Sequence, residues 1–349
     1  MLGFSVFLNK KLTVPEQKRI ELMKSSGFEG IFTSLNIPED NVSESLQRLK
    51  DLGGICKKLN FYLTVDVSIK GLNRLNIGIK DIYKLIDLGV TALRIDDGFS
   101  MEEVACLSNE MNIALNASTI SDLDIECLKD NHANFDNLEA WHNYYPRPET
   151  GLDNNWFIHK NEWLKKQGFT TMAFIASDTE LRGPIFAGLP TLECDRYTNP
   201  LVATIKLLND CNIDKVYVGD GTLSEKMCRK FEMFFSKNVL QLSIQSDAEF
   251  LYKSIWHNRP DISRDVVRLI EGRERNTEKI VPHETRTRLA GAITIDNCRY
   301  KRYCGELQIV KKQLNADTKV NVIGQVVASE VPLLQWIGSN QAIRFVKGD

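Results

Sequence analysis

The stretch "YLTVDVSIKGLNRLNIGIKDIYKLIDLGVTALRIDD" (residues 62–97) decides the fold, because two apolar, β-branched runs flank a helical pattern. Residues 62–68 and 92–97 have the composition of buried strands, and the helical pattern in residues 81–90 ends at Gly89. Two strands joined through a helix pair in parallel. Residues 62–97 therefore predict a β-α-β unit.

The same alternation of strand and helix fills the first two-thirds of the chain. It repeats eight times within about 235 residues, close to the usual size of a (β/α)8 barrel, that is, a TIM barrel. The strand-like runs are 4–9, 30–35, 62–68, 92–97, 113–119, 138–145, 171–178 and 215–220. An open doubly wound sheet is the alternative, but the count of eight and the lack of a G-x-G-x-x-G after the first strand favour the barrel.

Capping boxes mark three predicted helix starts that come just after strands. They pair Thr13 with Glu16, Ser100 with Glu103, and Thr222 with Glu225. From residue 239 the pattern changes to short strands at 240–244, 292–296, 306–310, 320–328 and 342–346, with a helix-like segment at 261–272. We therefore expect a catalytic barrel over residues 1–238 and a small β-rich domain over residues 239–349.

Net charge, apolar runs and cysteine usage disfavour several classes of partner and location. With 349 residues and a net charge of -2, the chain has no global charge that would favour nucleic acid or an anionic membrane as its partner. No run approaches the roughly 20 apolar residues of a membrane span, and the start lacks a signal-peptide pattern. Eight scattered cysteines without a C-x-x-C indicate free thiols in a reducing cytoplasm. We expect no metal and no cofactor, and the sequence leaves the oligomeric state, including a homo-oligomer, open.

In a barrel the functional site lies at the carboxyl ends of the strands. Each predicted strand ends in a polar residue: Asn9, Ser34, Asp66, Asp96, Asn116, His142, Ser177 or Asp178, and Asp220. Loops are polar in any case, but carboxylates at the ends of buried strands are costly unless they are paired. These strand ends are the candidate site.

Asp66 and Asp96 lead the catalytic candidates, because strands 3 and 4 of a barrel are neighbours. Two carboxylates brought close together can act as an acid and a base or nucleophile. A purely structural ion pair with Arg94 is the competing interpretation. A third is that Asp96 and Asp97 orient a substrate acetamido group as an internal nucleophile.

Further acids lie on predicted rim loops. Glu193 and Asp220 are the substitute catalytic carboxylates, and Glu149 is expected to contact substrate. A solvated loop glutamate is more often inert than catalytic, so Glu193 alone is a weak signal.

Anion binding is expected from Arg147, in "YPRPETG", and Arg182, in "LRGP", because a guanidinium beside proline or glycine suits bidentate capture of phosphate or carboxylate. Prolines 146 and 148 stiffen the loop around Arg147. The other expected substrate contacts are Asn116, Ser118, His142 and Tyr145. For Ser118 the favoured alternative is that Ser118, Thr119 or Ser121 only caps the next helix.

Six motifs resemble one known family, in order along nearly the whole chain. They are "GFEGIFTSL", "LRIDDGF", "LNAST", "HNYYPRPETGL", "RGPIFAGLPTLE" and "ITIDNCRYKRYCGELQI" with "VNVIG". This set is similar to the MupG-type 6-phospho-N-acetylmuramidases. The resemblance implies a TIM barrel followed by a cyclophilin-like domain. It also implies hydrolysis of the β-1,4 bond of N-acetylmuramic acid 6-phosphate–N-acetylglucosamine in cell-wall recycling.

Two alternatives belong to other functional classes. One is a non-catalytic phosphosugar-binding protein, in keeping with the outer-surface label once attached to this family. The other is a different phosphosugar-processing barrel enzyme, such as an isomerase or aldolase. The latter is disfavoured because no strand-end lysine offers a Schiff base. Release of N-acetylglucosamine would separate an enzyme from a binding protein.

Overall fold

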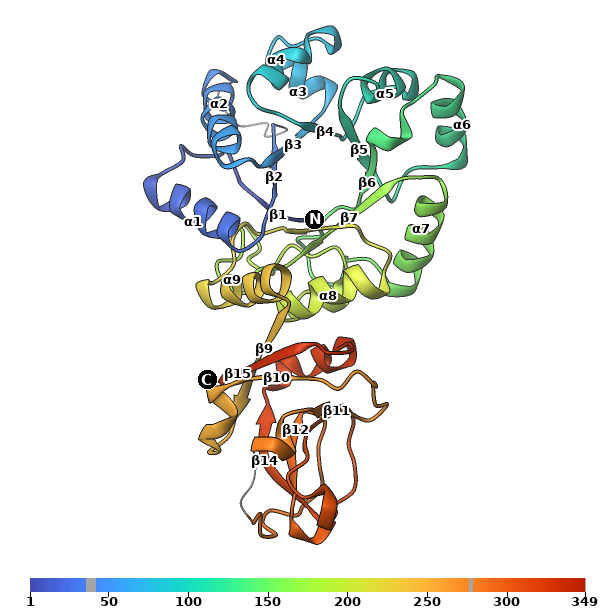
Figure 1. Ribbon diagram of the computed structural model, residues 1–349. Helices are drawn as coiled ribbons and strands as arrows, with labels where there is room; N and C mark the ends of the chain where they lie inside the picture. Colours follow the sequence, from blue (N-terminus) through green and yellow to red (C-terminus); the bar gives the residue numbers. More distant parts are fainter. Residues whose placement is uncertain (36–41, 276–278, 349) are drawn as a thin grey trace. The chain divides into compact units, whose positions relative to one another are not determined.

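A computed structural model describes residues 1–35, 42–275 and 279–348 (Figure 1). The chain forms two compact units, Met1–Cys228 and Arg229–Asp349.

The first unit is a closed barrel of eight parallel strands, each paired with the next in chain order (Figure 1). The strands are β1 (Leu2–Ser5), β2 (Gly30–Ser34), β3 (Tyr62–Val67), β4 (Ala92–Ile95), β5 (Asn112–Asn116), β6 (Leu138–Trp141), β7 (Thr170–Ile175) and β8 (Lys215–Val218). β8 pairs with β1 and closes the ring. The prediction of a (β/α)8 barrel is confirmed, and the doubly wound alternative is excluded.

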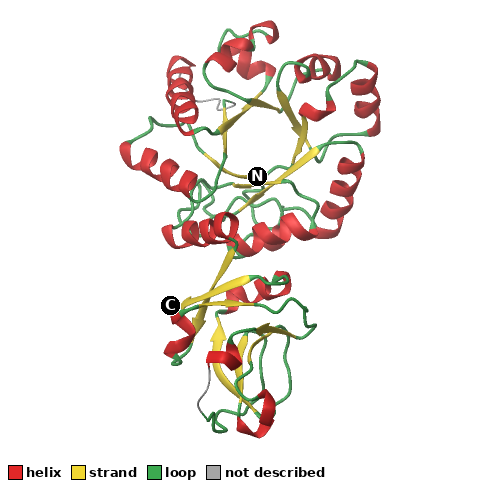
Figure 2. Cartoon of the chain, in the orientation of Figure 1, coloured by secondary structure: helices red, strands yellow, loops and turns green. Residues whose placement is uncertain are grey.

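Helices follow the strands and form the outer layer of the barrel (Figure 2). They are α1 (Val14–Ser25), α2 (Val42–Leu59), α3 (Ile69–Arg74), α4 (Tyr83–Asp87), α5 (Met101–Ser108), α6 (Asp122–Asp130), α7 (Asn154–Lys166), α8 (Pro200–Asp210) and α9 (Glu225–Phe231). The capping boxes at Thr13 and Ser100 are confirmed. The third is wrong: Ser224, not Thr222, accepts the backbone N–H of Met227 at the start of α9.

Large aromatic side chains fill the barrel. Trp141, Phe174 and Tyr217 are buried together with Phe32, and the Trp141 and Tyr217 ring centroids are 4.9 Å apart. Gly3 makes room for them, since a Cβ there would lie 2.3 Å from the Tyr217 ring. Burying each such ring stabilises the fold by about 1.5–3 kcal/mol.

Strand register decides which side chains enter the barrel at the carboxyl ends. Ser34 pairs with Asp66, and Asp66 pairs with Arg94, across β2, β3 and β4. Because side chains alternate along a strand, these three lie on the same face as Phe32, which is part of the barrel core. Ser34, Asp66 and Arg94 therefore point inward above the aromatic core.

The second unit contains a seven-stranded mixed sheet in the order β10-β15-β9-β14-β12-β13-β11. Its strands are β9 (Val239–Gln245), β10 (Ile255–His257), β11 (Val266–Leu269), β12 (Ala292–Asp296), β13 (Leu307–Val310), β14 (Val320–Val326) and β15 (Ala342–Lys347), and its short helix is α10 (Gly272–Arg275). The helix expected at 261–272 is wrong. Val267 and Leu269 alternate into the core while β11 pairs with β13, so the segment forms a strand.

Candidate active site

Asp66 and Arg94 form a buried ion pair at the mouth of the barrel. Arg94 donates from Nη1 to Asp66 Oδ1 at 2.7 Å, and Ser34 donates from Oγ to Asp66 Oδ2 at 2.9 Å. The side chains of Arg94 and Asp66 are only 6% and 11% exposed. The close contact offsets the cost of burying both charges, and it fixes the carboxylate in one orientation.

Asp96 lies just beyond the end of β4 and shares Arg94 with Asp66. Its Oδ1 is 3.5 Å from the same Nη1, and its side chain is 49% exposed. Since Nη1 is 2.7 Å from Asp66 Oδ1, the two carboxylate oxygens are at most 6.2 Å apart, the sum of those distances. The structure thus brings together the two acids that lead the catalytic prediction.

Asn143 and Tyr144 complete this side of the mouth, and neither was predicted as a site residue. Arg94 donates from Nη2 to the Asn143 side-chain oxygen. Tyr144 packs edge-on against the core residue Phe174, with ring centroids 5.1 Å apart. Period-two alternation beyond Trp141 would have pointed to Asn143, because it lies two residues further along the same face.

Burial raises the pKa of the Tyr144 hydroxyl above its ordinary value. The charges that act on it are those of Arg182, Asp66, Arg94 and Asp220. Tyr144 is therefore near both the Asp66–Arg94 pair and a second charged group, Arg182 and Asp220, at the mouth.

His142 does not reach the mouth, although it was expected to contact substrate. Its ring is fully buried, with Nε2 2.7 Å from Asn161 Oδ1 of α7 and the ring centroid 4.5 Å from that of Phe157. Burial lowers the pKa of His142 to about 4, so the imidazole is neutral at neutral pH. Since Trp141 points inward, the next residue points outward, and we withdraw the substrate-contact role.

Arg182 forms part of the second charged group at the mouth. Its guanidinium carbon lies 3.1 Å from the centroid of the Phe7 ring, a cation–π contact. Burial lowers the pKa of Arg182, while Tyr144 and Asp220 act in the opposite direction. Arg182 and Phe7 line a cavity of about 280 Å³ formed by α1 and by the loops after β1, β7 and β8. Loops after strands 7 and 8 often hold phosphate in barrel enzymes.

Asp220 organises the loop that carries Arg182. Its Oδ2 accepts the backbone N–H groups of Ser177 and Leu189, and its Oδ1 accepts that of Arg182, each at 3.0 Å. Three backbone donors occupy this buried carboxylate, which suits a positioning role better than a catalytic one.

Glu193 is a clamp between two loops. Arg196 donates from Nε to Oε1 at 2.7 Å and from Nη2 to Oε2 at 2.6 Å, and the backbone N–H groups of Glu149 and Gly151 donate to the same two oxygens. The Arg196 hydrogen bonds lower the pKa of Glu193 to about 2. A carboxylate with four donors and so low a pKa is unsuited to general acid catalysis, so we no longer place Glu193 among the catalytic residues.

This clamp shapes the loop around Arg147. Arg196 also donates to the carbonyl oxygens of Tyr145 and Arg147, while the Tyr145 N–H donates to Pro190. Glu149 has a left-handed backbone, with φ of 72°, and its side chain is exposed. Arg147 is exposed as well, so the loop is held through its backbone while these two side chains reach solvent.

Asn116 and Ser118 form a local turn at the end of β5. Asn116 Oδ1 accepts the Ser118 N–H at 3.1 Å. The Ser118 Oγ is buried, and within residues 1–35, 42–275 and 279–348 it has no hydrogen-bond partner. Ser121, one of the three residues expected as a possible cap, caps α6, so the capping alternative is confirmed for Ser121 and not for Ser118.

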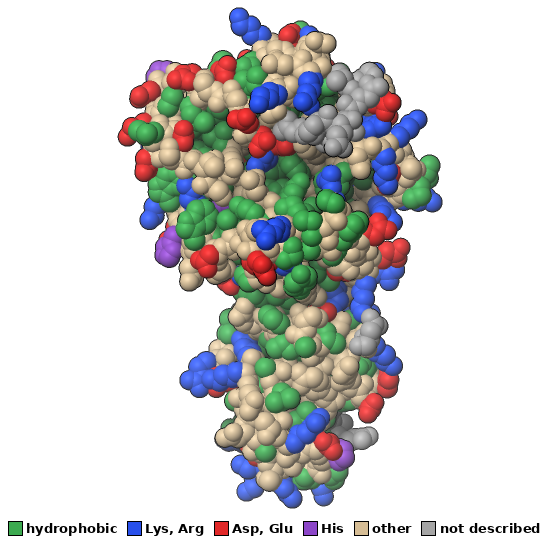
Figure 3. All heavy atoms as spheres, turned by 180° about the vertical axis from the view of Figure 1, so that it is seen from behind, with side chains coloured by type: hydrophobic (Ala, Val, Ile, Leu, Met, Phe, Trp, Pro, Cys, Tyr) green, Lys and Arg blue, Asp and Glu red, His purple; other side chains and the backbone are tan. Residues whose placement is uncertain are grey.

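Acidic, basic and hydrophobic side chains are interspersed on the face of the molecule seen in Figure 3.

Among the described residues, no three His, Cys, Asp or Glu side chains are grouped so that they could hold a metal ion. In the same part of the chain, no helix is both long and apolar enough to cross a bilayer.

A closed (β/α)8 barrel with carboxylates and guanidinium groups gathered at the carboxyl ends of its strands has the architecture of a barrel enzyme. Two family models match the chain: 6-phospho-N-acetylmuramidase, N-terminal, over residues 2–233, and 6-phospho-N-acetylmuramidase, C-terminal, over residues 237–346. The chain belongs to the 6-phospho-N-acetylmuramidase family.

Two solved structures are similar over nearly the full length. A conserved Enterococcus faecalis protein with an unknown function is 40% identical, with a TM-score of 0.92, over 99% of this chain and 96% of that chain. An uncharacterized B. cereus protein is 27% identical, with a TM-score of 0.76, over 99% of each chain. No curated protein matches this chain.

Proposed function

We propose that this protein is a glycoside hydrolase that cleaves the β-1,4 bond of N-acetylmuramic acid 6-phosphate–N-acetylglucosamine in cell-wall recycling. The observation that carries the proposal is the pair of carboxylates, Asp66 and Asp96, sharing one guanidinium group at the barrel mouth. Membership of the family supports the same activity. We further propose that the protein is cytoplasmic. That the second unit is cyclophilin-like stays a prediction.

The two acids suit different roles. Asp66 is held in one orientation by hydrogen bonds from Arg94 and Ser34, which suits a nucleophile or a stabiliser of positive charge at the anomeric carbon. Asp96 is more exposed and can exchange protons with the leaving group and with water. Tyr144 and Asn143 would position the sugar between them.

The decisive assay compares two substrates. Wild-type protein should release N-acetylglucosamine from the phosphorylated disaccharide and much more slowly from the unphosphorylated one. A binding protein would retain the phosphorylated disaccharide without releasing either sugar. Absence of release from both substrates by folded protein would refute the proposed activity.

The stereochemistry follows from the separation of the acids. Their nearest oxygens are at most 6.2 Å apart, below the roughly 6.5–9.5 Å that leaves room for a water in inverting enzymes. We therefore expect retention of the anomeric configuration, as would also result if Asp96 and Asp97 assisted the substrate acetamido group. Proton NMR of the first-formed product measures this directly, and an inverted product would contradict the assigned pair.

Arg182→Ala is expected to raise KM for the phosphorylated disaccharide by about 10–100-fold, because a charge-assisted hydrogen bond contributes about 1.5–3 kcal/mol. Removing a contact to the remote phosphate should change kcat less. Initial-rate kinetics on both disaccharides measures the effect, which should be small for the unphosphorylated substrate.

Arg264→Ala is the matched control, since Arg264 is an exposed arginine of the second unit, paired with Asp265 at 2.8 Å, and does not line the cavity that Arg182 lines. It should leave KM nearly unchanged. An unaltered KM in folded Arg182→Ala protein would show that Arg182 does not bind the phosphate.

A further inference from the structure

The second unit contains a cavity of about 590 Å³ that the proposed glycosidase chemistry does not use. Pro260, Leu269 and Ile270 form an apolar wall, and Ile270 is 42% exposed although it is hydrophobic. Arg259 and Arg273 also line it. A cavity of this size with apolar walls and a few polar groups is typical of a small-molecule site.

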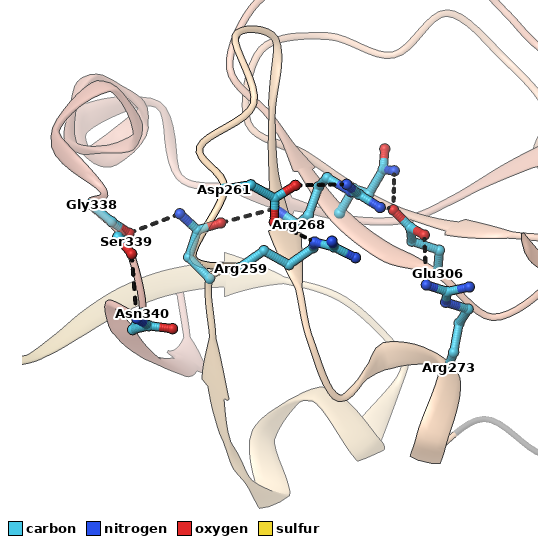
Figure 4. Close-up of polar contacts among 10 residues, drawn as sticks. Arg259, Asp261, Arg268, Arg273, Glu306, Gly338, Ser339 and Asn340 are labelled. Atoms are coloured by element: carbon cyan, nitrogen blue, oxygen red, sulfur yellow. Dashed lines mark hydrogen bonds and ion pairs between the residues drawn. The ribbon is translucent and has the colours of Figure 1, made fainter.

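Three arginines from different elements meet beside this cavity (Figure 4). Arg259 follows β10, Arg268 lies in β11 and Arg273 lies in α10. Arg268 donates from Nε to Glu306 Oε1 at 2.7 Å, and its Nη1 is 3.5 Å from Asp261 Oδ2. Arg268 is therefore held between two carboxylates.

Glu306 is the buried, ionised carboxylate that Arg268 and Arg273 face. Burial raises its pKa, but the hydrogen bonds from Arg268 and Gln308 outweigh burial and keep the pKa below its ordinary value. Its side chain is only 8% exposed. The position of Glu306 fixes Arg268 and places a negative charge near Arg273.

Arg259 and Arg273 retain unused donors. Arg259 uses Nε for Asp261 Oδ1 at 2.8 Å, and Arg273 Nη2 is 3.7 Å from Glu306 Oε2, which is too long for a hydrogen bond. Within the described residues, the Nη groups of Arg259 and the guanidinium of Arg273 donate no hydrogen bond. Both side chains are partly exposed, 35% for Arg259 and 43% for Arg273, so water can bond their remaining donors and a ligand carboxylate can replace that water.

The charges around the cavity select the kind of ligand. Arg259, Arg268 and Arg273 are balanced by Asp261, Glu306 and Glu274, so the formal charge is three minus three, or zero. A neutral group attracts a phosphate dianion less than a site with excess positive charge would. A single carboxylate matches the planar fork of a guanidinium, and the apolar wall accommodates the rest of the ligand.

We propose that this cavity binds an organic monocarboxylate, with its carboxylate on Arg259 and Arg273 and its apolar or ring-shaped part against Ile270. The site lies entirely within the second unit, so it does not depend on the activity proposed for the barrel.

Binding can be followed in the full-length protein by the backbone amide NMR signals of Ile270 and Arg273. Four probes distinguish the ligand class: N-acetylmuramic acid and 3-phenylpropionate carry one carboxylate, N-acetylglucosamine carries none, and inorganic phosphate tests the dianion. We expect saturable shifts with at least one carboxylate and none with N-acetylglucosamine. A local signal separates this site from any binding in the barrel.

The variant Arg259→Gln/Arg273→Gln should weaken carboxylate binding by about tenfold or more, because two charge-assisted contacts are lost. Arg264→Gln is the control, since Arg264 is 84% exposed and bonds Asp265. Arg259→Lys/Arg273→Lys keeps both positive charges but lacks the paired donors of the guanidinium groups, so this variant should bind the carboxylate with intermediate affinity. No shift with either carboxylate, equal shifts with N-acetylglucosamine, stronger binding of phosphate, or unchanged affinity in the folded double glutamine variant would each overturn the proposal.

Discussion

Asp66→Asn is expected to lower kcat on the phosphorylated disaccharide by about 10²–10⁴-fold, the usual contribution of a catalytic acid, base or nucleophile. The amide keeps the shape of the carboxylate but cannot attack or stabilise a cationic sugar carbon. KM should change little, because the phosphate contact at Arg182 is preserved. Release of N-acetylglucosamine gives kcat, and a thermal scan shows whether the variant is folded.

Asp214→Asn is a suitable control for this substitution. Asp214 also pairs with a cation, Lys165 at 2.8 Å, but it lies just before β8, at the opposite end of the barrel. Its replacement should leave kcat near the wild-type value. Asp96→Asn should lower kcat as well, so near-normal turnover in both folded mouth variants would remove the catalytic assignment.

The barrel was predictable because its signals are local and repeated. Each strand is a short apolar run, and the run in residues 62–67 carries Asp66 one residue before its end, at the mouth of the barrel. The helix start at Ser100 was equally readable, since a capping box needs only residues three apart. In the second unit, the segment around Val267 was wrongly predicted to be a helix. It forms a strand because it pairs with β13, which lies some forty residues away in the sequence. Sheet pairing of that kind is fixed by tertiary contacts.

For the candidate site, the sequence predicted only which residues lie at the carboxyl ends of the strands. The strand ends predicted that Asp66 and Asp96 lie at the mouth. They did not predict that His142 points outward and is buried against Asn161, while the next residue, Asn143, points inward and accepts a hydrogen bond from Arg94. The sequence pattern marked Glu193 as a rim carboxylate but could not show its partners, because Arg196 and the loop amides meet it only after two loops fold together. Acidic residues that look alike in the sequence thus differ in the donors around them, and those donors are fixed only by the fold.

Glu193→Gln should destabilise the barrel by about 3 kcal/mol, because it leaves a buried guanidinium without its counter-ion. The Arg196 side chain is 1% exposed and depends on Glu193 for its two shortest hydrogen bonds. Gly151 allows this approach, since a Cβ there would lie 2.7 Å from a Glu193 oxygen. Urea unfolding at pH 7 measures the loss, and Glu162→Gln, an exposed position on α7, is the control.

Acid should reveal the same clamp in the wild-type protein. Hydrogen bonds from Arg196 lower the folded-state pKa of Glu193 to about 2, so its stabilisation is complete above its ordinary pKa and is lost as the pH falls from about 4.5 towards 2. The glutamine variant cannot titrate there, so its unfolding free energy should fall less steeply over that range. A catalytic Glu193 would behave differently, because the variant would then lose turnover at an unchanged urea midpoint.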